Sequence, residues 1–281
     1  MIPPEFKHYE QLPYYSSMSL LITIVVFAGI AWLWFTSRHR KSTQEEKTPG
    51  TYRTILSEKV SFYQKLIAED KAKFEQSIDK FLADVHIEGV GTEITDVDRV
   101  LIASGAIIPI FGFPDWKYKN LTNIILYPDT FDQEFQFEGE NRNILGMVGS
   151  GYMNGQMLLS RAALLKGFSG SAGQGNTAIH EFVHLLDKSD GDTDGIPTNF
   201  MEQAYVVPWL KMMHQEMHRI AAGKSDFNPY GLTNEAEFLA VAAEYFFEKP
   251  DQLKHKHPEL YEVLSKIFGQ DPATNTAFEI G

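Results

Sequence analysis

Two histidines and a glutamate stand close together in the segment Thr177–Asp187, which reads TAIHEFVHLLD. His180 and His184 are four residues apart, so on an α-helix they lie on the same face, one turn from each other. Two imidazoles in this arrangement can bind one zinc ion, and Glu181 between them is placed to take a proton from water as a general base. The segment therefore predicts a hydrolytic zinc site.

An ordinary amphipathic helix with surface histidines is the alternative interpretation of this segment. Asn176 or Thr177 can cap the helix, and an Asp-Gly pair follows its end. The helix also has a continuous apolar face, formed by Ile179, Phe182, Val183 and Leu186. A capped helix with one apolar face packs against a core, which favours the buried, metal-bearing interpretation.

A catalytic zinc ion needs a third protein ligand and one position left open for water. The extended motif HExxHxxGxxH is absent, because Asp187 and Asp190 occupy its glycine and histidine positions. His214 and His218 form a second pair four residues apart, but Gln215 stands where the glutamate would be, so this pair is typical of another amphipathic helix. We therefore expect the third ligand to be a carboxylate from a downstream helix.

Two carboxylates in the segment YGLTNEAEFLAVAAEYFF, residues 230–247, are candidates for this ligand. Glu237 and Glu244 are two turns apart and lie together beside the apolar face of the expected helix. Glu237 has an equally good alternative, because with Asn234 as N-cap it occupies the third helical position and can complete a capping box. Glu244 can be a ligand, a partner of a ligating histidine or a surface residue, and spacing alone does not decide.

The composition limits the classes of protein to which the chain can belong. Its 281 residues include 25 Lys+Arg and 37 Asp+Glu, which gives a net charge of −12 and argues against a nucleic-acid-binding protein that neutralises phosphates. There is no cysteine, which excludes disulfide scaffolds, thiolate nucleophiles, zinc fingers and iron–sulfur clusters. Any metal ion must therefore be held by His, Asp or Glu.

The amino-terminal part carries a membrane signal. Residues 20–35 read LLITIVVFAGIAWLWF, and with residues 18, 19 and 36 the apolar run is long enough to span a bilayer. A buried core helix is the alternative, but the basic run RHRK follows directly at residues 38–41 and places the carboxyl side in the cytoplasm. We expect an extracytoplasmic segment at 1–17, a transmembrane helix at 18–36, a charged linker at 37–50 and a cytoplasm-facing domain at 51–281 on the bacterial inner membrane.

The domain itself has the pattern of an α+β fold. Apolar residues recur every three or four positions in 55–85, which predicts two helices, and again in 95–106, where Thr95 or Asp96 can cap a third. The run NIILY at 123–127 predicts a strand, and Asn154-Gly155 predicts a hairpin between strands near 151–153 and 157–160. After Asn176 the pattern is helical almost throughout, so we expect a mostly helical domain with a small mixed sheet.

Three segments together resemble the Mlc titration factor A family of zinc-dependent bacterial peptidases, which is related in its catalytic core to the anthrax lethal factor protease. The segments are HEFVHLLD, DGIP at Asp194–Pro197 and YGLTNEAEFLAVAAEYFF. The likeness continues through FLADVHIEGVGTEITDVDRVLIASGAIIPIFG, WKYKNLTNIILYPDTF and GQMLLS, so it covers Phe74 to Pro272. The familiar members of that family are soluble, whereas this chain has a predicted membrane span.

The resemblance implies a zincin-like fold of the gluzincin type and a zinc metallopeptidase activity, aminopeptidase action included. It places Zn²⁺ on His180, His184 and Glu237, the general base on Glu181, and a transition-state role on Tyr230. It also implies a regulatory partner, since the family's named partner is a sugar-transport repressor, although no residue pattern here indicates a surface for it.

In such a site the zinc ion activates a water molecule, Glu181 moves its proton to the leaving amine, and Tyr230 donates to the oxyanion. Asp187 and Glu244 are candidates to fix the orientation of a ligating histidine from outside the metal's ligand shell. Asp187 can equally be a carboxylate at the end of its helix, and the alternative for Tyr230 is a packing residue just before a helix. A peptide substrate can pair with an edge strand, for which we expect residues 157–160.

The alternative function is a regulatory protein that keeps zinc for structure and captures a partner at the inner membrane. The presence of both Glu181 and Tyr230 favours the peptidase, because a structural zinc site needs neither.

Overall fold

The computed structural model describes residues 51–134, 136, 143–149, 155–170, 173, 175–274 and 276–277. The segments expected at 1–17, 18–36 and 37–50, and the strand expected near 151–153, lie outside these residues. Within the described ranges, no helix is both long enough and apolar enough to cross a membrane. The chain divides into the units Met1–Pro49 and Gly50–Gly281, and the second contains all of the described residues.

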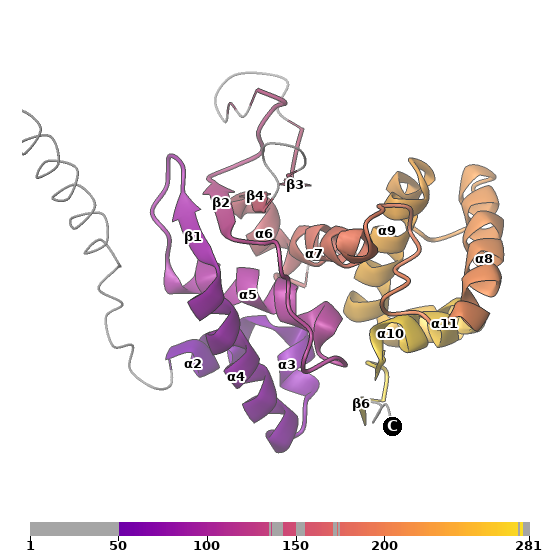
Figure 1. Ribbon diagram of the computed structural model, residues 1–281, viewed down its shortest axis with the longest axis horizontal. Helices are drawn as coiled ribbons and strands as arrows, with labels where there is room; N and C mark the ends of the chain where they lie inside the picture. Colours follow the sequence, from indigo (N-terminus) through magenta and orange to yellow (C-terminus); the bar gives the residue numbers. More distant parts are fainter. Residues whose placement is uncertain are drawn as a thin grey trace, which may run out of the picture. The chain divides into compact units, whose positions relative to one another are not determined.

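The described residues form a mostly helical domain with a small sheet (Figure 1). In chain order its elements are α2 (Thr51–Lys59), α3 (Ser61–Lys65), α4 (Ala68–Asp84), β1 (His86–Gly89), α5 (Asp96–Ile110), β2 (Asn123–Tyr127), β3 (Gly146–Val148), β4 (Gln156–Ser160), α6 (Arg161–Gly167), α7 (Thr177–Asp187), the 3₁₀ turn η2 (Lys188–Asp190), α8 (Gln203–Ala221), the 3₁₀ turn η3 (Pro229–Leu232), α9 (Glu235–Glu248), α10 (Pro250–Lys256), α11 (Pro258–Phe268), β5 (Gln270–Asp271) and β6 (Thr276–Ala277).

The main sheet is mixed, as the sequence predicts. Its strand order is β1-β2-β4-β3, with β1, β2 and β4 parallel and β3 antiparallel to β4. The register pairs Asn123 with Gln156 across β2 and β4, and Gly146 with Leu159 across β3 and β4. The prediction that residues 157–160 form the edge strand is wrong, because β4 lies inside the sheet and β3 is the strand at its end.

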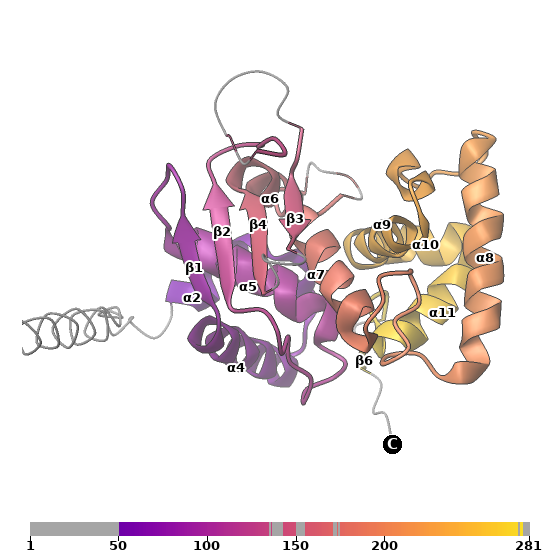
Figure 2. The same ribbon diagram turned by 45° about the horizontal axis from the view of Figure 1, so that its top comes forward.

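The alternation of side chains along the strands explains how the sheet is buried. Ile124, Leu126, Met157 and Leu159 face the main core, while Tyr127 and Leu158 face a smaller cluster on the other side. Helices α5, α6 and α7 cover the first of these faces (Figure 2). Among the described residues, one face of the sheet therefore packs against the main core and the other against the smaller cluster.

The first helices differ in number and length from the expectation. The region 55–85 contains α2, α3 and α4, so it forms three helices in place of two. Helix α5 begins after Thr95, whose side chain accepts a hydrogen bond from the N–H of Asp98, while the Asp98 side chain accepts from the N–H of Thr95. This capping box places the start of α5 where the sequence predicts it. The helix continues to Ile110, beyond the expected end at residue 106, and almost all of it is buried.

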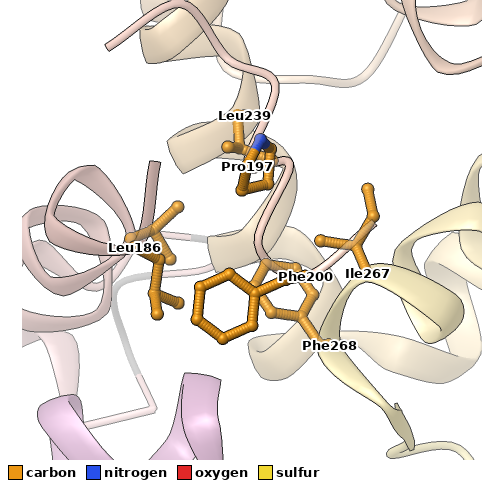
Figure 3. Close-up of a pocket in the computed structure, with 7 residues that line it drawn as sticks. Leu186, Pro197, Phe200, Leu239, Ile267 and Phe268 are labelled. Atoms are coloured by element: carbon orange, nitrogen blue, oxygen red, sulfur yellow. The ribbon is translucent and has the colours of Figure 1, made fainter. Parts of the chain in front are cut away.

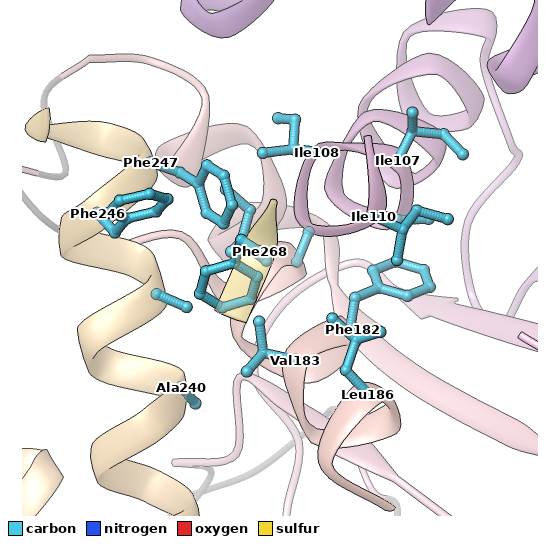
Figure 4. Packing of buried hydrophobic residues seen from close by; sticks show 14 of the residues in the cluster. Ile107, Ile108, Ile110, Phe182, Val183, Leu186, Ala240, Phe246, Phe247 and Phe268 are labelled. Atoms are coloured by element: carbon cyan, nitrogen blue, oxygen red, sulfur yellow. The ribbon is translucent and has the colours of Figure 1, made fainter. Parts of the chain in front are cut away.

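Helix α7 lies at the centre of the packing (Figure 4). Its residues Phe182, Val183 and Leu186 face the buried side chains of α5, α9 and α11. Helices α5 and α7 approach closely at Gly105, where an added Cβ would lie 2.5 Å from the Cβ of Ala178. A side chain at position 105 would therefore push α7 away from α5.

A narrow pocket lies on the core side of α7 (Figure 3). It is lined by Val183, Leu186, Pro197, Phe200, Leu239, Ile267 and Phe268. All of these side chains are apolar and come from α7, α9, α11 and the loop before α8. The pocket therefore belongs to the core that supports α7, on the side away from the histidines.

Candidate metal centre

The helix that carries the two histidines begins and ends where the sequence predicts. The side chain of Asn176 accepts a hydrogen bond from the N–H of Ile179 at 3.3 Å and caps α7. The apolar face of the helix is buried in the core, so His180 and His184 lie on its other side. The cap and the apolar face together set the rotation of α7 that presents both imidazoles in one direction.

Helix α9 brings the third group. Asn234 caps this helix by accepting from the N–H of Glu237 at 2.9 Å, so Glu237 does occupy the third helical position. The Glu237 side chain nevertheless extends to the histidines, with its Oε2 2.9 Å from Nε2 of His180 and 3.4 Å from Nε2 of His184. The backbone of Glu237 takes part in the cap, and its carboxylate lies in the histidine cluster.

The three groups have the spacing of ligands around one metal ion. The Nε2 atoms of His180 and His184 are 3.1 Å apart, and one ligand atom from each of the three residues lies within 4.8 Å of the others. Ligand atoms about 2.0–2.1 Å from a tetrahedral zinc ion are separated by roughly 3.3 Å. Two imidazoles and a carboxylate are also the donor types that zinc accepts in catalytic sites.

The hydrogen bonds around His180 support a cation at this position. Nδ1 of His180 donates to Oε1 of Glu244 at 2.7 Å, so the proton of the neutral imidazole is on Nδ1 and Nε2 carries a lone pair. This lone pair points at the carboxylate of Glu237 and at the second imidazole. Acceptors that converge in this way repel one another unless a proton or a metal ion lies between them.

The pKa values of the cluster reflect the same convergence. Burial by itself lowers the pKa of His180, but the hydrogen bonds to Glu237 and Glu244 outweigh it and raise this pKa to about 10. Burial raises the pKa of Glu237, and the two histidines outweigh that effect and lower it to about 2. Both shifts favour an ionised carboxylate beside a positive charge.

Glu244 joins the cluster to the start of α7. Its Oε1 accepts from His180 Nδ1, and its Oε2 accepts from the backbone N–H of Asn176. Asn176 also donates from Nδ2 to Oε1 of Glu248 at 2.9 Å. Among the roles left open for Glu244, the geometry therefore corresponds to a partner of a ligating histidine.

Glu181 is buried beside the edge strand. Its side chain is held against β3, because a Cβ added to Gly146 would lie 2.6 Å from Glu181 Oε1. Burial raises the pKa of Glu181, while the charges of His180 and His184 act in the opposite direction. A carboxylate with a raised pKa accepts a proton more readily than an exposed one, which is a property of a general base.

Tyr230 reaches the site from η3. Its side chain is 53% exposed, and its ring centroid lies 5.9 Å from that of His180. Partial burial, together with the charges of Glu237 and Glu181, raises the pKa of the Tyr230 phenol. The hydroxyl is therefore protonated near neutral pH and can donate a hydrogen bond.

Asp187 is fully buried at the end of α7, and of its two expected roles the contacts correspond to that of a carboxylate at the helix end. Its Oδ2 accepts from the N–H of Gly195 at 2.8 Å, which holds the following loop. In the described part of the chain, Oδ1 of Asp187 and Nδ1 of His184 have no hydrogen-bond partner, so the structure does not join them directly. Burial raises the pKa of Asp187 to about 6, against the hydrogen bond from Gly195.

Comparison with known proteins identifies the family in which this site occurs. The sequence profile of the "Glucose-regulated metallo-peptidase M90" family matches residues 34–269, which include α7, η3 and α9. The chain belongs to this M90 family. The resemblance stated from the sequence is thereby confirmed, since proteins named Mlc titration factor A are among the relatives.

The relatives are distant but match over nearly their whole length. An uncharacterized protein of Synechocystis is 27% identical over 270 residues, which cover 91% of this chain and 98% of the relative. Mlc titration factor A of Pectobacterium atrosepticum is 25% identical over 260 residues, covering 86% and 92%. The protein of the same name from Salmonella agona is 26% identical over 261 residues, covering 87% and 93%.

Two residues beside the histidine cluster have contacts that the sequence does not predict. The sequence predicts a cap at Asn176, but this residue also connects Glu244 and Glu248 of α9 to α7. Gly146 lies so close to Glu181 that there is no room for a side chain. A lone glycine in a short strand is a weak signal, and contacts across 35 residues of sequence leave no local pattern.

The second histidine pair lies apart from this cluster. His214 is exposed on α8, with its Nε2 3.1 Å from Oε1 of Glu235, and the group of metal-binding residues found in the described ranges contains neither His214 nor His218. The interpretation of this pair as part of an amphipathic helix agrees with its position on α8.

Proposed function

We propose that the protein is a zinc-dependent peptidase whose metal ion is held by His180, His184 and Glu237. The observation that carries the proposal is the convergence of two Nε2 atoms and one carboxylate oxygen at 2.9–3.4 Å, with the buried carboxylate of Glu181 on the same helix. A structural zinc site has four protein ligands and needs no base, whereas a catalytic site has three and keeps one position open.

The residues of the chain have distinct parts in the reaction. A bound zinc ion would lower the pKa of water to about 7 and polarise the scissile carbonyl. Glu181 accepts the proton of the attacking water and delivers it to the amine that leaves. Tyr230 donates a hydrogen bond to the oxygen that becomes negatively charged, and Glu244 keeps His180 in the tautomer whose Nε2 faces the site.

The edge strand β3 supports a peptide as the substrate. Antiparallel strands alternate in the direction of their backbone groups, and the bonds from Ser160 N–H to Leu145 O and from Gly149 N–H to Gln156 O show that residues 145, 147 and 149 face β4. The backbone groups of Gly146 and Val148 therefore point away from β4, toward the side of β3 on which no other described strand pairs, beside Glu181. An extended peptide can pair with them.

Turnover of peptides tests this proposal. The full chain in detergent should cleave amino-terminal chromogenic amides or longer peptides, lose turnover with a chelator and regain it with zinc. Glu181→Gln should keep zinc and lose turnover by about 10²–10⁴-fold, because an amide cannot accept the proton. Turnover by Glu181→Gln within threefold of the unchanged chain would refute the mechanism.

Metal content tests the ligand assignment separately. Glu237→Gln should lose most of the zinc measured by plasma emission, whereas Glu235→Gln, two residues earlier on α9, should retain it. A role of Glu237 in capping alone predicts that both variants hold about one zinc ion per chain, with about 1 kcal/mol of stability lost.

We also propose that residues 18–36 anchor the protein in the bacterial inner membrane with the domain in the cytoplasm. The support is the apolar run at 20–35 followed by the basic residues 38–41. Fusion of a periplasmic phosphatase or a cytoplasmic fluorescent protein after residue 60 decides the orientation. Phosphatase activity of the fusion would place the domain on the other side of the membrane.

A second function is favoured by the names of the relatives. Several are called Mlc titration factor A, a name that suggests binding of a regulatory protein. If this chain acts by capturing such a partner, Glu181→Gln should still bind the partner. Removal of zinc should abolish this binding where it unfolds the site. A peptidase requires Glu181 for both turnover and its biological effect.

A further inference from the structure

The loop that carries Tyr230 is held at one end by an unusual group of charges. This loop, residues 222–234, connects α8 to α9, and we refer to it as the Tyr230 loop. Tyr230 is half exposed, and its backbone N–H donates only to the side chain of Asn228 at 3.0 Å. The position of its hydroxyl therefore depends on what fixes the backbone of the loop nearby.

Asp226 fixes this backbone through four donors from the helices that follow. Its Oδ2 accepts from the hydroxyl of Tyr245 at 2.7 Å, from Nε2 of Gln252 at 3.1 Å and from Nζ of Lys256 at 2.8 Å. Its Oδ1 accepts from Nε2 of His257 at 2.7 Å. A carboxylate with four donors holds the loop firmly to α9, to α10 and to the start of α11.

His257 extends the network to α8. The imidazole is buried, and its other nitrogen, Nδ1, lies 3.6 Å from Oε2 of Glu216. Oε1 of Glu216 in turn accepts from the hydroxyl of Ser225 at 2.5 Å, and Ser225 directly precedes Asp226 in the loop. Burial lowers the pKa of His257, and the carboxylates of Glu216 and Asp226 outweigh it and raise the pKa.

The next residue of the loop, Phe227, connects the Asp226 network to the turn of α9 that carries Glu237. Phe227 is buried, with its ring stacked on Phe238 at 5.6 Å and edge-on to His257 at 5.0 Å. Phe238 directly follows Glu237, whose carboxylate lies in the histidine cluster. The backbone that leads to Tyr230 is thus packed against the turn of α9 that presents a ligand.

We propose that His257 is a positioning residue for Tyr230: by joining Glu216 of α8 to Asp226 of the loop, it fixes the loop that holds the phenol over His180. The inference rests on the proposed function, because Tyr230 matters for turnover only if it acts on the substrate. His257 itself lies outside the reacting groups. Its effect on kcat must therefore pass through Tyr230, so replacing His257 cannot lower kcat more than removal of the Tyr230 hydroxyl does.

A double-mutant cycle tests this dependence. Tyr230→Phe should lower kcat by about 10²–10³-fold, as the removal of one oxyanion donor does. His257→Gln should lower kcat at least fivefold but less than Tyr230→Phe does, with zinc content and KM close to those of the unchanged chain. Combined with Tyr230→Phe, it should cause no further loss. His255→Gln, an exposed histidine on α10, is the matched control and should leave kcat unchanged.

Equal losses from His257→Gln in the two backgrounds would show a general structural role and overturn the proposal. An unchanged kcat of His257→Gln in the chain that retains Tyr230 would overturn it as well. Asp226→Asn serves as a second variant should His257→Gln fold poorly, because it weakens the same contact from the other side and predicts the same cycle.

Hydrogen–deuterium exchange separates this proposal from the proposed function. Exchange of the amides at 226–233 should be faster in His257→Gln than in His255→Gln, whether or not the protein turns over a peptide. Unchanged exchange would overturn the positioning role of His257. An unchanged chain that binds zinc, protects this loop and cleaves no peptide would instead refute the proposed function alone.

Discussion

Replacement of Glu244 by glutamine is the most direct test of how α9 controls the metal site. The carboxylate accepts two hydrogen bonds, one on each oxygen, from His180 Nδ1 and from the N–H of Asn176. Glutamine has only one carbonyl oxygen. Its amide NH₂ must face one of these two donors, so one of the two hydrogen bonds is lost whichever way the side chain turns.

The size of the effect follows from the bond that is lost. A hydrogen bond to a charged group contributes about 1.5–3 kcal/mol. Loss of a group that orients a ligating histidine typically weakens metal binding by about 10–100-fold, which corresponds to about 1.4–2.8 kcal/mol. The two estimates agree, so we expect Glu244→Gln to raise the dissociation constant for zinc by one to two orders of magnitude.

Competition with a chromogenic chelator at fixed pH measures this constant. Glu248→Gln is the matched control on the next turn of α9, because its retained carbonyl oxygen can still accept from Asn176 Nδ2. We expect zinc affinity within twofold of the unchanged chain for this control. The same small change in Glu244→Gln would refute the argument that Glu244 sets the orientation of His180.

Three further predictions follow from the packing around the site. Gly146→Ala should keep zinc but lower turnover by up to about 100-fold, because the new Cβ displaces Glu181; undiminished kcat would contradict this. Burial raises the pKa of Glu248 from its usual value of 4.5 to about 7. Between these two pH values the folded state binds more protons than the unfolded state, so the free energy of unfolding of the wild type falls as the pH rises. The melting temperature of Glu248→Gln relative to wild type should therefore increase from pH 5 to pH 8, and calorimetry showing a constant difference would contradict the shift. Phe182→Ala should cost about 3–5 kcal/mol in urea unfolding, since its buried ring packs against those of both Phe81 and Tyr118; a loss below 1 kcal/mol would show that the core collapses around the gap.

The parts of the fold that the sequence predicts are those with local signals. Helix α7 begins after Asn176 because a cap and an apolar face coincide there, and β2 is a run of apolar residues that ends at a proline. The strand β1 was not predicted, because its four residues are too few to show a period. The place of β4 inside the sheet was also not predictable, since parallel pairing with β2 leaves no mark on either strand.

In the candidate site, the contact made by the Glu237 side chain likewise could not be predicted from the local sequence. Its spacing fits a capping box and a metal ligand equally well; the structure shows the Asn234 cap and places the carboxylate of Glu237 beside the histidines. The backbone N–H of Glu237 is capped by Asn234, whereas the carboxylate faces another helix. Which partner the side chain takes depends on α7 lying against α9, and that contact joins segments more than 50 residues apart.

The same contact explains why Glu237 and Glu244 have different roles although they share one face of α9. Seven residues separate them, which is about 10 Å along the helix axis. The imidazole of His180 lies between the two carboxylates, with Nε2 toward Glu237 and Nδ1 toward Glu244. One carboxylate therefore meets the nitrogen that faces the metal position, and the other meets the nitrogen that carries the proton. A shift of α9 along its axis would disturb both contacts at once, so the axial position of this helix, which begins at the Asn234 cap, sets both contacts together.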